Sequence, residues 1–297
     1  MPRSITRRQF LGAAAAGTLI AGQTWAGERR GDSLSFGLVT DIHYADVPSG
    51  GSRHYRDSLA KLGRAVETFR QRKVSFVAEL GDFVDAGPGK EADLKYLAAA
   101  RKVFEAFSGP RHFVLGNHCL ARLTKQEFLA ACGANHGQSD KASPHYSFDR
   151  GPYHFVVLDA NFKRDGSPYA AGNFSWTDTV IPEPQLKWLA GDLKNASDKK
   201  TVVLVHQNLD KEDDPHGVKN APQVRKILEA AGNVLAVFQG HMHTGGYRKV
   251  GGIHYCTLRA MVEGPAAENN AYAIVTLGPG DRVALEPFAR QPAMAFG

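Results

Sequence analysis

The sequence contains few cysteines, and beyond its N-terminal residues it has no long apolar run. Its 297 residues include three cysteines, Cys119, Cys132 and Cys256, which are too few for a fold built on disulfide bonds. In an oxidising compartment Cys119 and Cys132 could pair and leave Cys256 alone, or all three could be buried free thiols. No apolar run after residue 26 is long enough to cross a bilayer, so we expect no stable insertion into a membrane.

The charged residues also lack any long run of one sign. The formal net charge is +6, and three of the positive charges lie within the first 26 residues, which contain no acidic residue. Without a Lys/Arg run or a long acidic tail, the sequence gives little support to a nucleic-acid-binding surface, and we expect no nucleic-acid partner. The chain also lacks internal repeats and low-complexity linkers. Its length suits one large domain, which we place at residues 33–290.

The N-terminal residues have the pattern of an export signal. Two consecutive arginines, Arg7 and Arg8, precede a short run from Ala13 to Ala21 that is rich in Ala and Gly. Small residues at Thr24-Trp25-Ala26 stand where a signal peptidase would cut. Residues 1–26 thus resemble a twin-arginine signal, which implies a folded protein carried by the twin-arginine export machinery to a periplasmic or secreted location. An uncleaved anchor or a chance basic end is the alternative.

Apolar runs of strand length alternate with helical patterns in the first half of the chain. The predicted order is strand, helix, strand, helix and strand, over residues 34–40, 59–69, 74–80, 94–107 and 112–115. This alternation favours parallel strands with helices on the faces of the sheet.

The second half has more predicted strands than helices. Thr124 and Glu127 form a capping-box pattern for a short helix, and Pro182 and Pro184 stand near the start of a helix over residues 186–193. Strands are predicted at residues 146–148, 154–158, 201–205, 234–238, 254–258 and 271–277. We therefore predict an α/β (α+β) fold, a four-layer α-β-β-α sandwich with two mixed sheets face to face and helices outside.

Polar side chains follow the ends of five predicted strands. They are Asp41 and His43, Asp82, Asn117 and His118, His206, and His241 with His243. In open α/β sheets, ligands bind beyond the carboxyl ends of the strands, so five segments could deliver these groups to one place. Each short pattern alone is weak. The ordered set of Asp-x-His, Gly-Asp-x-x-Asp, Gly-Asn-His, His and Gly-His-x-His is specific.

This ordered set resembles the fingerprint of the calcineurin-like metallophosphoesterases, and the resemblance runs across nearly all of the chain after the signal. It implies two metal sites joined by a bridge: Asp41, His43 and His243 for one ion, Asn117, His206 and His241 for the other, and Asp82 for the bridge. Carboxylate and imidazole ligands suit manganese, iron and zinc, and we expect manganese first. Two such ions can clamp the attacking and leaving oxygens at phosphorus and lower the pKa of a shared water.

The resemblance gives His118 a catalytic role and not the role of a metal ligand. The family uses the histidine after the Asn to contact a phosphate oxygen and protonate the leaving group, and the last Asp of Gly-Asp-x-x-Asp, Asp85 in this chain, orients it. Asp85 could instead be a solvated loop carboxylate. The sequence departs from the family at Cys119, where Glu or Asp is common. We interpret Cys119 as a local structural change, because the metal ligands and His118 are intact.

Further stretches resemble the manganese-dependent ADP-ribose/CDP-alcohol diphosphatase group. They are Tyr44-Ala45-Asp46, Tyr55-Arg56-Asp57-Ser58-Leu59 and Gly245-Gly246-Tyr247. The resemblance implies hydrolysis of a phosphodiester or phosphoanhydride, first in nucleoside diphosphate-linked compounds. Tyr44, Arg56 and Tyr247 are candidates for the wall of the substrate site, or for ordinary surface packing.

Aromatic residues gather in the loop after Asp159. Phe162, Tyr169, Phe174 and Trp176 could stack on a nucleobase or pack the loop down, and we favour packing. A phosphomonoesterase or cyclic-nucleotide phosphodiesterase would use the same metals and is the alternative function. A non-catalytic metal-binding module is the alternative from another class, and the intact ligand set with His118 argues against it.

Overall fold

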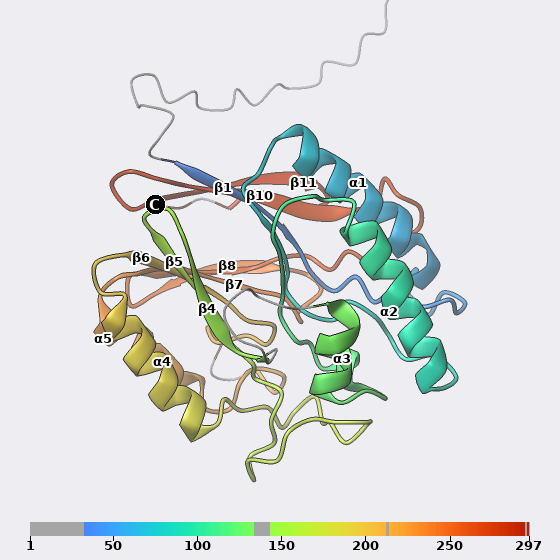
Figure 1. Cartoon of the computed structure of the whole chain (residues 1–297), viewed down its shortest axis with the longest axis horizontal. Coiled ribbons are helices and arrows are strands. Elements are labelled where there is room, and N and C mark those ends of the chain that lie inside the picture. Colours follow the sequence, from blue (N-terminus) through green and yellow to red (C-terminus); the bar gives the residue numbers. More distant parts are fainter. Residues whose placement is uncertain (1–32, 134–142, 212–213, 295, 297) are drawn as a thin grey trace, which may run out of the picture. The chain divides into compact units, whose positions relative to one another are not determined.

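The computed structural model describes residues 33–133, 143–211, 214–294 and 296 (Figure 1). These residues belong to one structural unit, which begins at Ser33. The export signal predicted at residues 1–26 lies outside the described residues. Within the described part of the chain, no helix is both long and apolar enough to cross a membrane.

The first sheet has five strands in the order β11-β10-β1-β2-β3. They are β1 (Leu34–Val39), β2 (Val77–Glu79), β3 (Arg111–Phe113), β10 (Ala271–Gly278) and β11 (Arg282–Ala289). The first three strands are parallel, and β10 runs antiparallel to both of its neighbours. Helices α1 (Ser58–Gln71) and α2 (Lys90–Phe104) connect the parallel strands, which confirms the predicted alternation.

The second sheet has six strands in the order β4-β5-β6-β7-β9-β8. They are β4 (Tyr146–Arg150), β5 (Tyr153–Val157), β6 (Lys200–Leu204), β7 (Val234–Gln239), β8 (Gly246–Val250) and β9 (Ile253–Thr257). The four central strands are parallel, and antiparallel β4 and β8 form the edges. Helices α4 (Glu183–Asn195) and α5 (Ala221–Ala231) belong to this half. The sequence did not predict α5, β8 or β11.

Three apolar clusters hold the layers together. Between the sheets, Phe36 of β1 packs edge to face against Phe155 of β5 and Phe238 of β7, with centroids 5.3 and 6.0 Å apart. On the outer faces, the first sheet packs against α1, α2 and α3 (Lys125–Cys132), and the second packs against α4 and α5 (Figure 1). Successive strand residues face opposite layers, so one strand serves two clusters. This arrangement confirms the predicted four-layer sandwich.

Two local predictions from the sequence can be read directly from the structure. Thr124 accepts a hydrogen bond from the Glu127 amide, and the Glu127 carboxylate accepts one from the Thr124 amide, which confirms the capping box of α3. Cys119, Cys132 and Cys256 are buried free thiols. This is one of the two arrangements that the sequence left open.

Candidate metal centre

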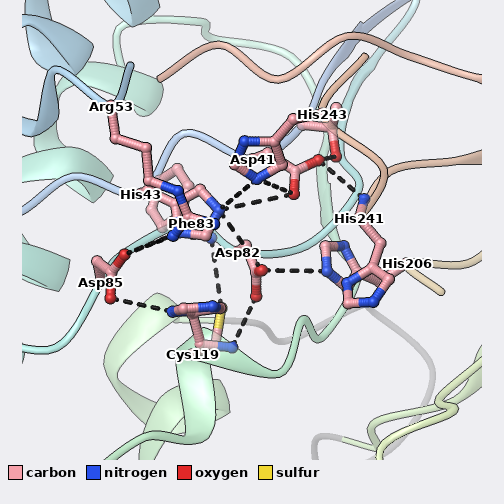
Figure 2. A network of polar contacts seen from close by, with 12 residues as sticks. Asp41, His43, Arg53, Asp82, Phe83, Asp85, Cys119, His206, His241 and His243 are labelled. Atoms are coloured by element: carbon pink, nitrogen blue, oxygen red, sulfur yellow. Dashed lines mark hydrogen bonds and ion pairs between the residues drawn. The ribbon is translucent and has the colours of Figure 1, made fainter. Parts of the chain in front are cut away.

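The predicted ligands lie in loops that follow the carboxyl ends of β1, β2, β3, β6 and β7, and the fold brings them together. Figure 2 shows the side chains of Asp41, Asp82 and the neighbouring histidines converging from separate loops. Potential ligand atoms lie within 4.8 Å of one another in each of three groups. Two of them, Asp41, His43 and His243, and Asp82, His206 and His241, match the two sets that the sequence predicts, apart from Asn117. The third joins His43 and Asp82 with His118, which the sequence predicts as an acid and not as a ligand.

In the first group, His43 and His243 direct the same ring nitrogen at each other. Their Nε2 atoms are 3.2 Å apart, while the Nδ1 atoms lie 3.1 Å from Asp85 and 2.6 Å from Glu263 respectively. Because a carboxylate only accepts, each Nδ1 donates, which leaves the two Nε2 atoms to bind a shared proton or a metal ion. Asp41 Oδ1 lies 3.6 and 3.5 Å from these two nitrogens. The three atoms therefore form a site for one cation.

The raised pKa of His43 indicates that positive charge is favoured between His43, His243 and Asp41. Burial opposes protonation of His43, yet its contacts with Asp41 and Asp85 outweigh burial and raise its pKa to about 10. Asp41 is also buried, and its Oδ1 has no hydrogen-bond partner among the described residues. A metal ion bound at this point would replace the proton and satisfy the unpaired oxygen. The residues present therefore fit a metal ion.

In the second group, the orientation of His206 is set by a backbone carbonyl. Its Nδ1 lies 2.9 Å from the oxygen of Leu80, so Nδ1 donates and Nε2 faces Asp82 Oδ2 at 3.1 Å. Burial opposes protonation of His206, but Asp82 outweighs burial and raises its pKa, so this pair also attracts positive charge. Burial and the nearby His206 lower the pKa of His241 to about 3, which keeps that ring neutral and able to act as a ligand.

Asn117 supplies a further unsatisfied group. Its side chain is buried, and neither its Oδ1 nor its Nδ2 has a hydrogen-bond partner within the described part of the chain. Leaving a buried amide unpaired is costly, and coordination of a metal ion by Oδ1 would offset that cost. The Asn117 side chain thus has the character expected of the fourth member of the second ligand set.

Asp82 lies between the two groups. Its Oδ2 is 3.1 Å from His206 Nε2 and 3.6 Å from His43 Nε2, and its Oδ1 accepts a hydrogen bond of 2.8 Å from the His118 amide. Burial opposes ionisation of Asp82, but the neighbouring His206 and His118 hold its pKa well below the ordinary value. This position suits the bridging role, which stays a prediction.

The backbone of the centre is strained. Among the described non-glycine residues with positive φ are Asp41 at 50°, His43 at 45°, Asp82 at 59° and His241 at 69°. Such residues cost of order 1–3 kcal/mol each, and they persist where surrounding structure enforces them. The amide of Asp41 donates to Gly81 O at 3.0 Å, and that of His43 donates to Asp82 O at 2.8 Å. These bonds between the β1 and β2 loops hold the strained ligands in place.

Two glycines of the motifs are required by close approach. Gly81 has φ of +105°, and a Cβ there would stand 2.4 Å from His206 Nδ1. A Cβ on Gly116 would stand 2.1 Å from the backbone nitrogen of Asp82. Any larger residue at either position would displace a predicted ligand, so these are not merely turn glycines.

Asp85 is nearly buried beside His118 instead of being solvated. Its side chain is 12% exposed, with Oδ1 3.0 Å from His118 Nδ1 and Oδ2 3.1 Å from His43 Nδ1. Burial opposes ionisation of Asp85, yet hydrogen bonds from His118 and His43 lower its pKa. One carboxylate therefore orients both a predicted ligand and the predicted acid. The ring centroid of His118 lies 4.7 Å from that of His43, and His118, His43 and Asp82 together form the third group of potential ligands.

Glu263 is a member of the centre that the sequence did not predict. It lies 2.6 Å from His243 Nδ1, and it follows β9 in a stretch without a recognisable motif. The fully buried Lys61 fixes this stretch, because its Nζ donates to the carbonyls of Met261, Glu263 and Gly264 at 2.9, 3.0 and 2.7 Å. The position of Glu263 depends on this tertiary contact, which no sequence spacing could have indicated.

The three candidates for the substrate wall make contacts with other residues of the protein. Tyr44 packs edge to face on Tyr96 at 5.8 Å, and the exposed Arg56 donates to Asp46 at 2.6 Å. The hydroxyl of Tyr247 lies 2.8 Å from His254 Nδ1 on the neighbouring strand. A substrate role for Tyr44, Arg56 and Tyr247 stays a prediction.

The aromatic residues after Asp159 divide between packing and exposure. Tyr169 is buried, and its hydroxyl donates to the carbonyls of Ser175 and Asp178. Phe162 lies under the ammonium of Lys125, which is 3.4 Å from the ring centroid. Trp176 differs, because it is 46% exposed and its ring centroid is 5.3 Å from that of His118. An apolar surface therefore stands beside the predicted acid.

Known proteins resemble this chain in both sequence and fold. A family model described as calcineurin-like phosphoesterase matches residues 34–245. Two proteins named manganese-dependent ADP-ribose/CDP-alcohol diphosphatase, from Oryza sativa subsp. japonica and Arabidopsis thaliana, are 30% and 31% identical to it. Each match covers 78% of this chain, and 84% and 87% of the relatives.

The fold is also that of a solved structure. A dimetal phosphatase from Danio rerio superposes with a TM-score of 0.75 at 23% identity, over 86% of this chain and 96% of that one. At this identity the likeness concerns the fold alone. The family match spans more than half of the sequence, and it includes all seven predicted ligand positions. This chain therefore belongs to the calcineurin-like phosphoesterase family, whose members are metal-dependent hydrolases of phosphate esters or anhydrides.

Proposed function

We propose that this protein hydrolyses the diphosphate linkage of nucleoside diphosphate-linked compounds, such as ADP-ribose or CDP-alcohols. The observation that carries the proposal is the position of Asp82, whose Oδ2 faces His206 of one predicted ligand set and His43 of the other, in a chain similar to relatives named for those substrates. We expect manganese first as the bound metal, and the same carboxylate and imidazole donors also suit iron or zinc.

The metals, when bound, supply positive charge for the phosphate oxygens and lower the pKa of a water between them. Asp41, His43 and His243 would hold one ion, Asn117, His206 and His241 the other, and Asp82 both. His118 supplies the proton for the leaving oxygen. Because its Nδ1 is bound by Asp85 at 3.0 Å, Nε2 is the nitrogen that exchanges a proton with the substrate.

The exposed Trp176 favours a substrate that carries a nucleobase. A base stacked on its indole would lie beside His118, and such stacking contributes ~1–3 kcal/mol per base in other proteins. We expect Trp176→Ala to raise KM for ADP-ribose and to leave KM for p-nitrophenyl phosphate, which has no base, nearly unchanged. An equal change for both substrates would remove this support.

We also propose that the protein is exported, on the basis of the paired Arg7 and Arg8 and the Thr24-Trp25-Ala26 pattern. Residues 1–26 would then be absent from the mature protein. A periplasmic or secreted enzyme would meet nucleotides outside the cytoplasm.

A panel of substrates tests the proposed function. Protein loaded with manganese is assayed on ADP-ribose, CDP-glycerol, cyclic AMP and p-nitrophenyl phosphate. We expect the highest kcat/KM on the first two, because each has a diphosphate linkage next to a nucleoside. A preference for cyclic AMP or p-nitrophenyl phosphate would instead identify a cyclic-nucleotide phosphodiesterase or a phosphomonoesterase.

A further inference from the structure

Arg53 lies beside the metal centre and has donors to spare. Its guanidinium is 3.6 Å from Asp85 Oδ2, and its side chain is 26% exposed. Among the described residues it makes no side-chain hydrogen bond, although a guanidinium has five N–H donors. Figure 2 shows the side chain extending from a neighbouring loop toward His43 and Asp85. A partly exposed, loosely paired arginine at a phosphate-processing centre is a candidate for binding substrate.

The backbone of Arg53 is held firmly. Its amide and carbonyl exchange hydrogen bonds of 3.0 Å with Gly50, and the neighbouring His54 amide donates to Val262 O at 2.9 Å. The backbone of Arg53 also pairs with that of Glu263 in an isolated antiparallel β-bridge, and Glu263 is the residue that orients His243. The loop of Arg53 is therefore fixed relative to the first ligand group, and its side chain begins from a defined position.

Asp85 lies between Arg53 and His118, the predicted acid for the leaving group. One carboxylate oxygen of Asp85 contacts His118 Nδ1 at 3.0 Å, and the other faces the Arg53 guanidinium at 3.6 Å. His118 and Arg53 thus flank the same carboxylate. In a diphosphate, the oxygen that His118 would protonate is bonded directly to the second phosphorus. Arg53 therefore lies beside the predicted acid, and its unused donors are available to a phosphate group attached to the leaving oxygen.

We propose that Arg53 binds the second phosphate of a diphosphate substrate, the one that departs with the leaving group. This inference rests on the proposed function, since a phosphomonoester has no such group. The planar guanidinium can form two parallel hydrogen bonds to phosphate oxygens. Its charge also offsets the negative charge that the second phosphate adds next to Asp85.

Arg70 provides a control. It lies on α1, its Nη1 donates to Glu67 at 2.8 Å and its side chain is 54% exposed. Replacing Arg70 removes the same charge. It leaves the contact between Arg53 and Asp85 in place.

Isothermal titration calorimetry tests the proposal by measuring how tightly manganese-loaded protein binds each of two nucleotides. The probes are AMP and α,β-methylene-ADP, which has a second phosphate group and a linkage that cannot be hydrolysed. Wild-type protein should bind α,β-methylene-ADP more tightly than AMP. Arg53→Gln should weaken binding of α,β-methylene-ADP at least ~10-fold and leave AMP nearly unchanged, as expected for a lost charge-assisted hydrogen bond. Arg70→Gln should change neither affinity.

A structural role for Arg53 predicts a different result. If Arg53 only braces Asp85 and His118, Arg53→Gln should weaken the binding of both nucleotides equally or of neither. Either result overturns the proposal. Arg53→Lys keeps the charge and should restore part of the preference for the second phosphate. Circular dichroism and metal content are measured for every variant, so that an unfolded or metal-depleted protein is recognised.

The substrate panel separates this inference from the proposed function. Wild-type protein that hydrolyses ADP-ribose but binds α,β-methylene-ADP no better than AMP would contradict the role of Arg53 and leave the function standing. Protein that shows the Arg53-dependent preference but does not hydrolyse ADP-ribose or CDP-glycerol would contradict the function and leave the second-phosphate site standing.

Discussion

The carboxylate of Asp85 accepts a hydrogen bond from His118, with 3.0 Å between Oδ1 and Nδ1. Burial opposes ionisation of Asp85, but the hydrogen bonds from His118 and His43 lower its pKa, so it stays a carboxylate at neutral pH. An acceptor on Nδ1 fixes the ring and its proton there. Proton exchange with the substrate therefore takes place at Nε2.

We predict that His118→Asn keeps both metals and loses rate. General acid catalysis typically contributes ~10²–10⁴-fold, and the loss should grow as the leaving group becomes a poorer one. A p-nitrophenyl ester should suffer least, ADP-ribose more, and an alkyl phosphodiester most. Asp85→Asn should follow the same order more weakly. The measurements are kcat for each substrate and metal content by elemental analysis. Equal losses across leaving groups, accompanied by metal depletion, would mean that His118 braces the loop of Asn117.

We predict that Glu263→Ala weakens manganese binding. Without the carboxylate 2.6 Å from Nδ1, His243 loses the partner that holds its ring and raises its basicity. Loss of such a partner typically lowers metal affinity ~10–100-fold. Titration calorimetry with manganese measures the effect, and Glu268→Ala, an exposed carboxylate on the same connection, is the control. An unchanged affinity for Glu263→Ala, or an equal loss in the control, would contradict the prediction.

A pH-dependent contact lies away from the metal centre, at His154 of β5. Its Nδ1 is 2.8 Å from Asp149 and its Nε2 is 2.8 Å from Asp192. Burial opposes protonation of His154, but the carboxylates of Asp192 and Asp149 outweigh burial and raise its pKa. Because the folded-state pKa is raised, the resulting stability is fully present below the unfolded value of about 6.5, and it is lost as pH rises through the folded value.

We therefore predict that wild-type protein is more stable than His154→Gln at pH of about 6, and that the difference in Tm narrows as pH rises through the folded-state pKa. Thermal unfolding followed by circular dichroism over a series of pH values measures the difference. Melting curves whose separation does not change with pH would show that the charge on His154 contributes nothing.

We predict that Arg7→Lys with Arg8→Lys leaves the protein in the cytoplasm. Lysine keeps the positive charge but lacks the guanidinium that the export machinery would recognise. Cell fractionation locates the protein, and N-terminal sequencing of the exported wild type should show that residues up to about Ala26 are missing. Normal export of the double variant would exclude a twin-arginine signal.

Much of the centre could be predicted from the sequence because its ligands stand at the ends of apolar strands. Asp41 follows β1 and His206 follows β6, each after a single residue, so the order of the strands alone places both side chains at carboxyl ends of strands. Glu263 could not be predicted, since the contacts of Lys61 position it. The sequence predicts Arg56 as a substrate-wall candidate and does not predict Arg53, because the turn that pairs Arg53 with Gly50 sets its position.

The elements that the sequence did not predict have weak patterns. β8 is an edge strand with the polar residues Arg248 and Lys249 in its middle, and β11 is an edge strand that contains Pro287. Proline lacks an amide donor and is found in sheets mainly at such edges, so it argues against a central strand without excluding an outer one. Helix α5 begins with a proline in its first turn and carries a short apolar stripe.

The central claim is that Asp82 joins two metal ions in one centre. The direct test is the metal content of wild-type protein and Asp82→Ala, measured by elemental analysis after manganese loading and removal of excess metal, with circular dichroism to verify folding. We predict two metal ions per chain in the wild type, and at most one, with turnover abolished, in the folded variant. Two metal ions retained per chain in Asp82→Ala would contradict the account.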